Sequence, residues 1–185
     1  MDSILRYQFE EGDGQIELLF AMIGRTFFKI CERDRWGVVP ILLGHGIGKS
    51  TIMSIISAMF NSKSVGEIRT NRCMHRVFCN ELILIQNLQK EISKVISPDV
   101  FEKMVSGEQI RLRMKYKPSI ICTWTAPLFM ESNVMLDYDD DLTHRRLVVF
   151  RFEKSPSRDA IDTTLSKRII DSELPNIVAR SLLGK

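Results

Sequence analysis

The sequence predicts an α/β fold in which a mainly parallel central sheet is flanked by helices. Apolar runs of strand length alternate along the chain with segments whose apolar residues recur at helical spacing. A glycine-rich stretch also stands between the first of these runs and a helical segment. Strands separated by helices favour parallel pairing, because each connection returns the chain to the same end of the sheet. The 185 residues are expected to form a single domain with a sizeable core.

Composition excludes several classes of protein. Hydrophobic residues make up 44% and charged residues 26% of the chain, as in soluble globular proteins, and the net charge of +3 does not by itself imply a partner. The four cysteines, at positions 31, 73, 79 and 122, lack zinc-site spacing and are expected to be reduced core thiols. Neither a signal peptide nor an apolar run of about 20 residues is recognisable, so we expect an intracellular protein with no membrane segment.

The first 60 residues predict a loop, two helices and a strand between them. Residues 1–14 are polar and are expected to be loop. In the segment 15–31 apolar residues recur three and four apart, which predicts an amphipathic helix. The segment 38–43 is a candidate buried strand, although Pro40 removes one backbone donor from it. The segment 51–60 predicts a helix directly after the glycine-rich stretch.

The rest of the chain alternates in the same way. We expect a strand at 76–81, a helix at 83–96, and a short helix at 100–105 that ends at Ser106-Gly107. In the segment 110–116 apolar residues alternate with basic ones, which predicts a strand with one basic face. The remaining expected elements are a buried strand at 119–124, an acidic loop at 137–141, a strand at 147–152 and a C-terminal helical segment within 155–185, interrupted at Pro175.

The glycine-rich stretch, residues 44–51, has the sequence Gly-His-Gly-Ile-Gly-Lys-Ser-Thr and is typical of a phosphate-binding loop. Glycines let backbone N–H groups curl around an anion, and the helix that follows directs its N-terminus at the same point. A lysine adds positive charge, and a serine hydroxyl supplies a ligand to Mg²⁺ held with the phosphates. The residues expected to hold a nucleotide are Gly44, Gly46, Gly48, Lys49, Ser50 and Thr51, with Ser50 also on the metal.

The loop departs from the usual pattern by one residue. That pattern is glycine, four residues, then Gly-Lys-Ser/Thr, and it places the first glycine at Leu43, one position before Gly44. The alternative interpretation is a glycine turn between a strand and a helix, with an incidental lysine. The order of strand, loop and helix favours nucleotide binding.

Glu81 is the candidate acidic residue of the site. It ends the strand expected at 76–81, and in nucleoside triphosphatases such strand ends carry one carboxylate that helps to hold magnesium and one that orients or deprotonates water. We therefore expect Glu81 to serve as a metal ligand and as the catalytic base. Asn80 stands where a first carboxylate is usual, and a surface glutamate at a strand end is the alternative.

Five blocks of sequence carry a resemblance to a known family, and they are residues 34–40, 48–52, 101–108, 115–117 and 145–150. Taken together, these blocks resemble the superfamily 3 helicase domain of the primase–helicases of large eukaryotic DNA viruses, such as poxviruses and phycodnaviruses. The likeness covers residues 20–175. It implies an AAA+-like P-loop NTPase, in a viral protein located inside the host cell.

The resemblance also implies cofactors, partners and further site residues. It implies ATP and Mg²⁺ as cofactors, and a homo-hexameric ring with ATP bound between subunits. Arg145 or Arg146 would act as an arginine finger on a neighbour's nucleotide, and a solvated pair beside acidic residues 139–141 is the alternative. Arg113, Lys115 and Lys117 would grip the phosphates of single-stranded DNA in the ring's pore, and an amphipathic strand with lysines in water is the alternative.

The function that follows is an ATP-dependent DNA helicase for viral DNA replication. The family carries an asparagine after its third strand, whereas residues 123–127 contain none, and Thr125 is the candidate substitute. Because this position, the loop and Asn80 all depart from the family, a degenerate, non-hydrolysing nucleotide- or DNA-binding assembly module is the alternative. A small-molecule kinase fits less well, because nothing resembles an acceptor site. A primase domain or subunit is a further expected partner, and the chain could be a fragment of a longer primase–helicase.

Overall fold

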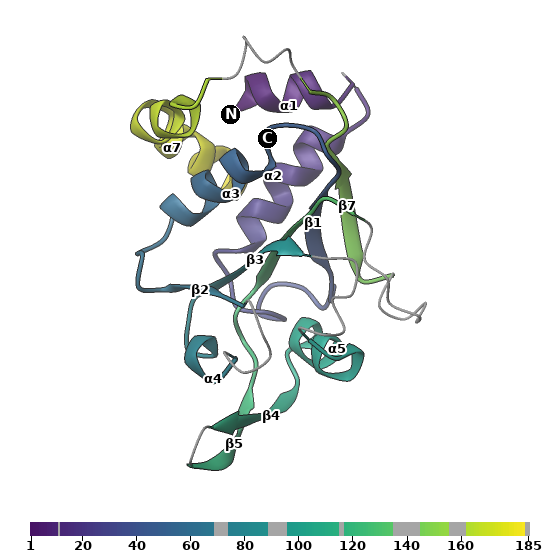
Figure 1. Cartoon of the computed structure of the whole chain (residues 1–185), viewed down its shortest axis with the longest axis vertical. Coiled ribbons are helices and arrows are strands. Elements are labelled where there is room, and N and C mark those ends of the chain that lie inside the picture. The colour runs from purple at the N-terminus through teal and green to yellow at the C-terminus, as the bar shows by residue number, and fades with distance from the viewer. Residues whose placement is uncertain are drawn as a thin grey trace.

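The computed structural model describes residues 1–10, 12–68, 74–88, 96–114, 117–134, 145–155 and 162–183. A five-stranded sheet of order β2-β3-β6-β1-β7 forms the centre, and all of its pairings are parallel. The mainly parallel α/β fold is therefore confirmed (Figure 1). The strands are β1 (Val39–Leu43), β2 (Val65–Glu67), β3 (Leu82–Leu88), β6 (Leu128–Ser132) and β7 (Leu147–Arg151).

Helices cover the two faces of this sheet, and a hairpin packs against the helices of one face. Side chains alternate between the faces along each strand, so Ile41 enters one buried cluster and Leu42 the other. One cluster contains side chains of α1 (Asp2–Gln8), α2 (Gln15–Arg25), α3 (Lys49–Ala58) and α7 (Leu165–Leu183). The other contains side chains of α4 (Met74–Val77), α5 (Pro98–Ser106) and the antiparallel hairpin of β4 (Gln109–Met114) and β5 (Lys117–Thr123).

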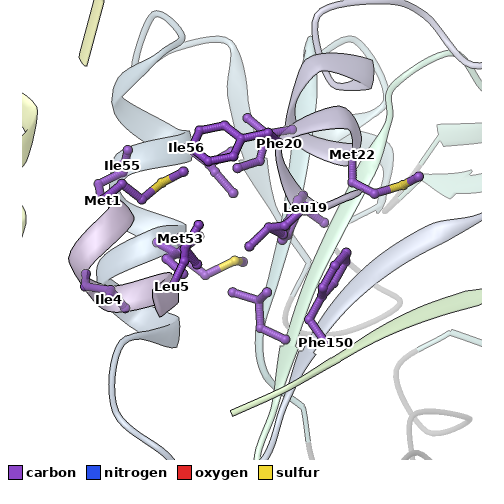
Figure 2. Close-up of a cluster of buried hydrophobic side chains, with 14 of the residues drawn as sticks. Met1, Ile4, Leu5, Leu19, Phe20, Met22, Met53, Ile55, Ile56 and Phe150 are labelled. Atoms are coloured by element: carbon purple, nitrogen blue, oxygen red, sulfur yellow. The ribbon is translucent and has the colours of Figure 1, made fainter. Parts of the chain in front are cut away.

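Helix α1 corrects the prediction that residues 1–14 are loop. Its seven residues are too few for an amphipathic pattern to be recognised, and a helix of this length is not stable by itself. Burial against neighbouring elements stabilises it, because Met1 and Leu5 lie in the same cluster as Met53 of α3. Figure 2 shows these side chains meeting those of α2 near Phe150 of β7.

The structure reverses the elements expected between residues 76 and 96. The segment 76–81 contains the end of α4 and a turn, so the prediction of a strand there is wrong. The segment 83–96 was expected as a helix, but its first part belongs to strand β3. Both faces of β3 are buried along Leu82–Ile85, so its apolar residues do not alternate with polar ones. A continuous apolar run of this kind cannot be distinguished from a buried helix by its period.

The third expected strand is also displaced. The segment 119–124 overlaps β5, which pairs with β4 in the hairpin and is not part of the central sheet. Its Ile121 is 61% exposed, so the expected burial is wrong as well. The strand that does lie in the sheet is β6, which begins directly after Pro127 and which the sequence pattern did not reveal.

The other predicted elements are close to those observed. Strands β1 and β7 and helices α3 and α5 are confirmed, whereas α2 ends at Arg25, before the expected residue 31. Pro40 is tolerated in β1 because the register with β6 begins only at Ile41. Pro175 lies inside α7 and does not interrupt it. The acidic loop expected at 137–141 lies outside the described residues. Within the described residues, every helix is too short or too polar to cross a membrane.

Candidate nucleotide site

The loop of residues 44–48 connects the carboxyl end of β1 to the N-terminus of α3. Gly44 and Gly48 have φ angles of +119° and +113°, in the left-handed region that only glycine adopts without strain. A Cβ atom on Gly46 would lie 2.5 Å from the carbonyl carbon of Phe152. The glycines are therefore required by the backbone path itself, which turns sharply and passes close to the chain that follows β7.

Hydrogen bonds tie the outer side of this loop to two distant segments. The N–H groups of Gly46 and Ile47 donate to the carbonyl oxygens of Phe152 and Lys154, at 2.6 and 3.3 Å. The Gln8 side-chain amide donates to the carbonyls of Ile47 and Lys154, at 2.9 and 2.6 Å, and accepts the N–H of Lys154 at 3.0 Å. One buried glutamine at the end of α1 thus joins the loop to the segment after β7.

The side chain of Lys49 lies within the curve of the loop. The residue is only 5% exposed, and its Nζ donates to the carbonyl oxygens of Gly44 and, at 3.1 Å, of Gly46. Burial lowers the pKa of Lys49, and the charge of Glu131 acts in the opposite direction. As the first residue of α3, Lys49 also begins a helix whose first N–H groups have no acceptor within the helix. Positive charge and N–H donors of this kind suit an anion.

Glu131 is a site residue that the sequence analysis missed. It lies on β6, level with Leu42 of β1, and is 5% exposed. Its Oε1 accepts a hydrogen bond from the Ser50 hydroxyl at 2.9 Å. A single glutamate directly after the apolar run of residues 128–130 is the sequence feature that could have indicated it, since a buried charge needs a partner.

The structure corrects the placement of Glu81. This residue is exposed and precedes β3, at the amino end of the sheet, whereas the loop lies at the carboxyl ends of the strands. The seven residues of β3 separate the two ends by roughly 20 Å, so Glu81 cannot share a magnesium ion with Ser50. The carboxyl end of β3 carries Gln86 and Asn87, which are amides and not carboxylates.

The structure also changes the candidate for the asparagine position, for which the sequence offered Thr125. Thr125 belongs to the connection that enters β6 at the amino end of the sheet, where the N–H of Ile83 donates to Pro127. The role expected for Thr125 is therefore wrong. Asn133 follows β6 directly, at the carboxyl end, and is exposed. An asparagine therefore stands at the end of a strand of the central sheet, and it was overlooked because β6 was not recognised.

Arg145 and Arg146 lie just before β7, at the amino end of the sheet. The Arg146 guanidinium donates to Glu102 Oε1 at 2.7 Å, and its side chain is 19% exposed. Arg145 is exposed and makes no ion pair with another described residue. Neither arginine can reach the loop of its own chain, because β7 lies between them and that end of the sheet. Residues 139–141, their alternative partners, lie outside the described chain.

The basic strand belongs to a hairpin that extends away from the sheet (Figure 1). On β4, Ile110 and Leu112 are buried and Arg111 between them is exposed, which agrees with the predicted alternation. Arg113 and Lys117 lie near the turn, but their side chains, like the whole of Lys115, lie outside the described part of the structure. Their contact with DNA stays a prediction.

The donor set beside the loop suits magnesium. A hydroxyl and a carboxylate oxygen, from Ser50 and Glu131, are the hard ligands that this ion prefers. Across the described residues no three or more His, Cys, Asp or Glu side chains gather as a metal site. Magnesium bound here would complete its coordination with further oxygen ligands beyond these two.

Comparison with solved structures agrees with this architecture. The chain is similar to the apo structure of the NrS-1 C-terminal region, with a TM-score of 0.71 and 14% identity over 100% of this chain and 45% of that chain. It is also similar to JCV helicase, with a TM-score of 0.56 and 10% identity over 91% of this chain and 49% of that chain. The chain has a helicase-like fold. No family model and no curated protein matches the sequence.

This chain spans less than half the length of either solved chain. At 14% and 10% identity the likeness concerns the fold, and the activity has to be argued from the site. In that fold the loop, Ser50, Glu131 and Asn133 come together at the carboxyl edge of the sheet, where ligands of open α/β sheets bind.

Proposed function

We propose that the chain is an ATP-dependent DNA helicase module of the superfamily 3 type, acting on single-stranded DNA in viral DNA replication. The observation that carries the proposal is the phosphate-type loop at the carboxyl end of β1, with Lys49 inside it and Ser50 bonded to a buried carboxylate. The helicase-like fold supports the choice of a helicase over other nucleotide-binding proteins.

Lys49 and the start of α3 would hold the phosphates. The Lys49 ammonium is bonded to loop carbonyls in this structure, and a phosphate offers it a stronger, charged acceptor. The first N–H groups of α3, including that of Thr51, would donate to the same anion. Ser50 would add its hydroxyl to Mg²⁺, which neutralises phosphate charge during transfer. Asn133, directly after β6, would contact the terminal phosphate.

Assembly is the second part of the proposal. Arginines at the amino end of β7 would act on the nucleotide of another subunit, because β7 separates them from the loop of their own chain. We therefore propose an assembly of several copies, a homo-hexameric ring inside the host cell. The similar solved chains are about twice as long as this one, so we also propose that further protein, such as a primase domain or subunit, completes the assembly.

Nucleotide binding is tested first. Lys49→Ala is expected to weaken binding of a fluorescent ATP analogue about tenfold, because one charged hydrogen bond to phosphate is lost. Titration with and without Mg²⁺ measures the effect. Lys63→Ala, at an exposed turn position, is the matched control and is expected to bind like the wild type. Equal affinities of Lys49→Ala and wild type would contradict nucleotide binding at this loop.

A non-hydrolysing assembly module remains the second candidate. It is favoured by the amides Gln86 and Asn87 at the end of β3, and by the N–H of Gly46, which is already used by Phe152. Sustained phosphate release, stimulated by single-stranded DNA, would exclude this module. Turnover by the wild type no higher than that of Lys49→Ala would exclude the enzyme.

DNA binding by the hairpin has its own prediction. Replacing both Lys115 and Lys117 with alanine is expected to reduce the slope of log affinity against log salt by about 1.4, because each phosphate contact on a single strand contributes about 0.7. Fluorescence anisotropy of a labelled oligo-dT, measured across a salt series, gives the slope. Lys63→Ala is again the control. An unchanged slope in the double variant would mean that DNA does not follow the hairpin.

A further inference from the structure

We infer that Glu131 is the carboxylate that positions magnesium at this site, through Ser50, and that strand β6 has taken over a role usually assigned to the end of β3. The inference rests on the proposed nucleotide binding. It concerns a residue that the resemblance does not assign to the site.

The first argument is topological. β6 lies directly beside β1 in the sheet, and Glu131 is level with Leu42, two residues before the loop begins. Ser50 lies in the first turn of α3, immediately after the loop. The Oε1 of Glu131 is 2.9 Å from the Ser50 hydroxyl, so the strand and the helix bring the two groups into contact across 81 residues of sequence.

The second argument is the chemistry of the hydroxyl. The Ser50 hydroxyl donates a hydrogen bond to Glu131, and the lone pairs of Oγ are therefore free to face a cation. A serine held in this way is oriented as a metal ligand before the metal arrives. A hydroxyl with its proton directed at the metal site would repel the ion.

The third argument is charge. Glu131 is 5% exposed, and burying a carboxylate is costly unless cations or donors compensate it. Lys49 is the nearby cation, and its ammonium would move toward the phosphates when nucleotide binds. Mg²⁺ would then replace part of the positive charge that Glu131 loses. A buried carboxylate at this position is therefore better explained by a cation site than by packing.

The fourth argument is the composition of β3. Its carboxyl end carries Gln86 and Asn87, beside an irregularity in the register with β6 between Ile85 and Leu88. Neutral amides supply no charge to a divalent cation. Glu131 is thus the acidic side chain that the structure places in contact with Ser50.

The test measures how strongly Mg²⁺ tightens binding of the fluorescent ATP analogue. In Glu131→Gln the half-saturating Mg²⁺ concentration is expected to rise about tenfold, the usual effect of losing a partner that orients a metal ligand. Affinity for the metal-free analogue is expected to stay the same or to increase, because a negative charge is removed. Ser50→Ala is expected to reproduce the Mg²⁺ effect, and the double variant to be no worse than either single variant, because both act on one ligand.

Two further variants make the result decisive. Glu81→Gln, at the opposite edge of the sheet, is expected to leave the Mg²⁺ dependence unchanged. Glu131→Asp keeps the charge with a shorter side chain and is expected to raise the half-saturating Mg²⁺ concentration less than Glu131→Gln does. It also serves if the amide variant fails to fold.

The outcomes separate the two proposals. If Glu131→Gln leaves the half-saturating Mg²⁺ concentration unchanged, the inference is overturned while nucleotide binding stands. If Glu131→Gln does not fold, the same follows when Glu131→Asp leaves this concentration unchanged although Ser50→Ala raises it. Equal weakening of metal-free and Mg²⁺-dependent binding would mark Glu131 as a structural residue and also overturn it. A wild type that binds no analogue would instead reject the proposed function.

Discussion

Replacing Arg145 with alanine is expected to lower ATP hydrolysis about 1,000-fold, the effect of losing an arginine finger. Affinity for ATP is expected to stay within about twofold, because a finger stabilises charge that develops only in the transition state. Arg145 is the better candidate because it is exposed and has no ion pair among the described residues, whereas Arg146 is paired with Glu102. Phosphate release and analogue titration together measure the two effects.

The same variant can show whether the arginine acts between subunits. Arg145→Ala and Lys49→Ala are each expected to be inactive alone, yet a mixture of the two should recover activity. Each mixed interface with an intact lysine on one side and an intact arginine on the other forms a complete site. Arg168→Ala, on the exposed side of α7, is the matched control. No recovery on mixing, with both variants shown to exchange subunits, would contradict an interface site.

Gly46→Ala is expected to damage both the fold and the site. The added Cβ would lie 2.5 Å from the carbonyl carbon and oxygen of Phe152, and these are backbone atoms that cannot turn aside. We expect the free energy of unfolding to fall by about 3 kcal/mol, the upper range for overpacking. Affinity for the ATP analogue is expected to fall about 100-fold, because the loop must leave its position around Lys49 and the start of α3.

Thermal unfolding and analogue titration measure these two losses. Ile47→Ala is the matched control, since the Ile47 side chain is 39% exposed and its removal leaves the backbone of the same loop unchanged. We expect this control to change stability by less than about 0.5 kcal/mol. A Gly46→Ala variant as stable as Ile47→Ala would show that the loop does not pack against the segment after β7.

The strand, loop and helix from Val39 to Ala58 could be predicted because each part has a local cause. The glycines permit an unusual backbone, and the apolar residues that follow have a clear helical period. Strand β7 and helix α5 were equally evident for local reasons. Helix α1 was not, because its stability comes from packing against α3 and not from its own residues.

The rest of the site was missed because it depends on sheet order. The apolar run of residues 82–85 fits a buried helix as well as a buried strand, and taking it as a helix moved the acidic position to Glu81. β6 is only five residues long and follows a proline, so no strand was predicted there and neither Glu131 nor Asn133 was considered for the site. Their proximity to Ser50 arises from pairing between strands that are distant in sequence, which no local pattern encodes.

The hydrogen bonds of Gln8 bear on the order in which the chain can fold. They connect the end of α1 to a loop 39 residues later and to a carbonyl 146 residues later, so the loop reaches its final form only after Lys154 has been synthesised. Closing such long chain segments is slow compared with forming a helix. Nascent chains that end before β7 should therefore contain α3 without a competent anion cradle, and the capacity to bind nucleotide should be acquired late in biosynthesis.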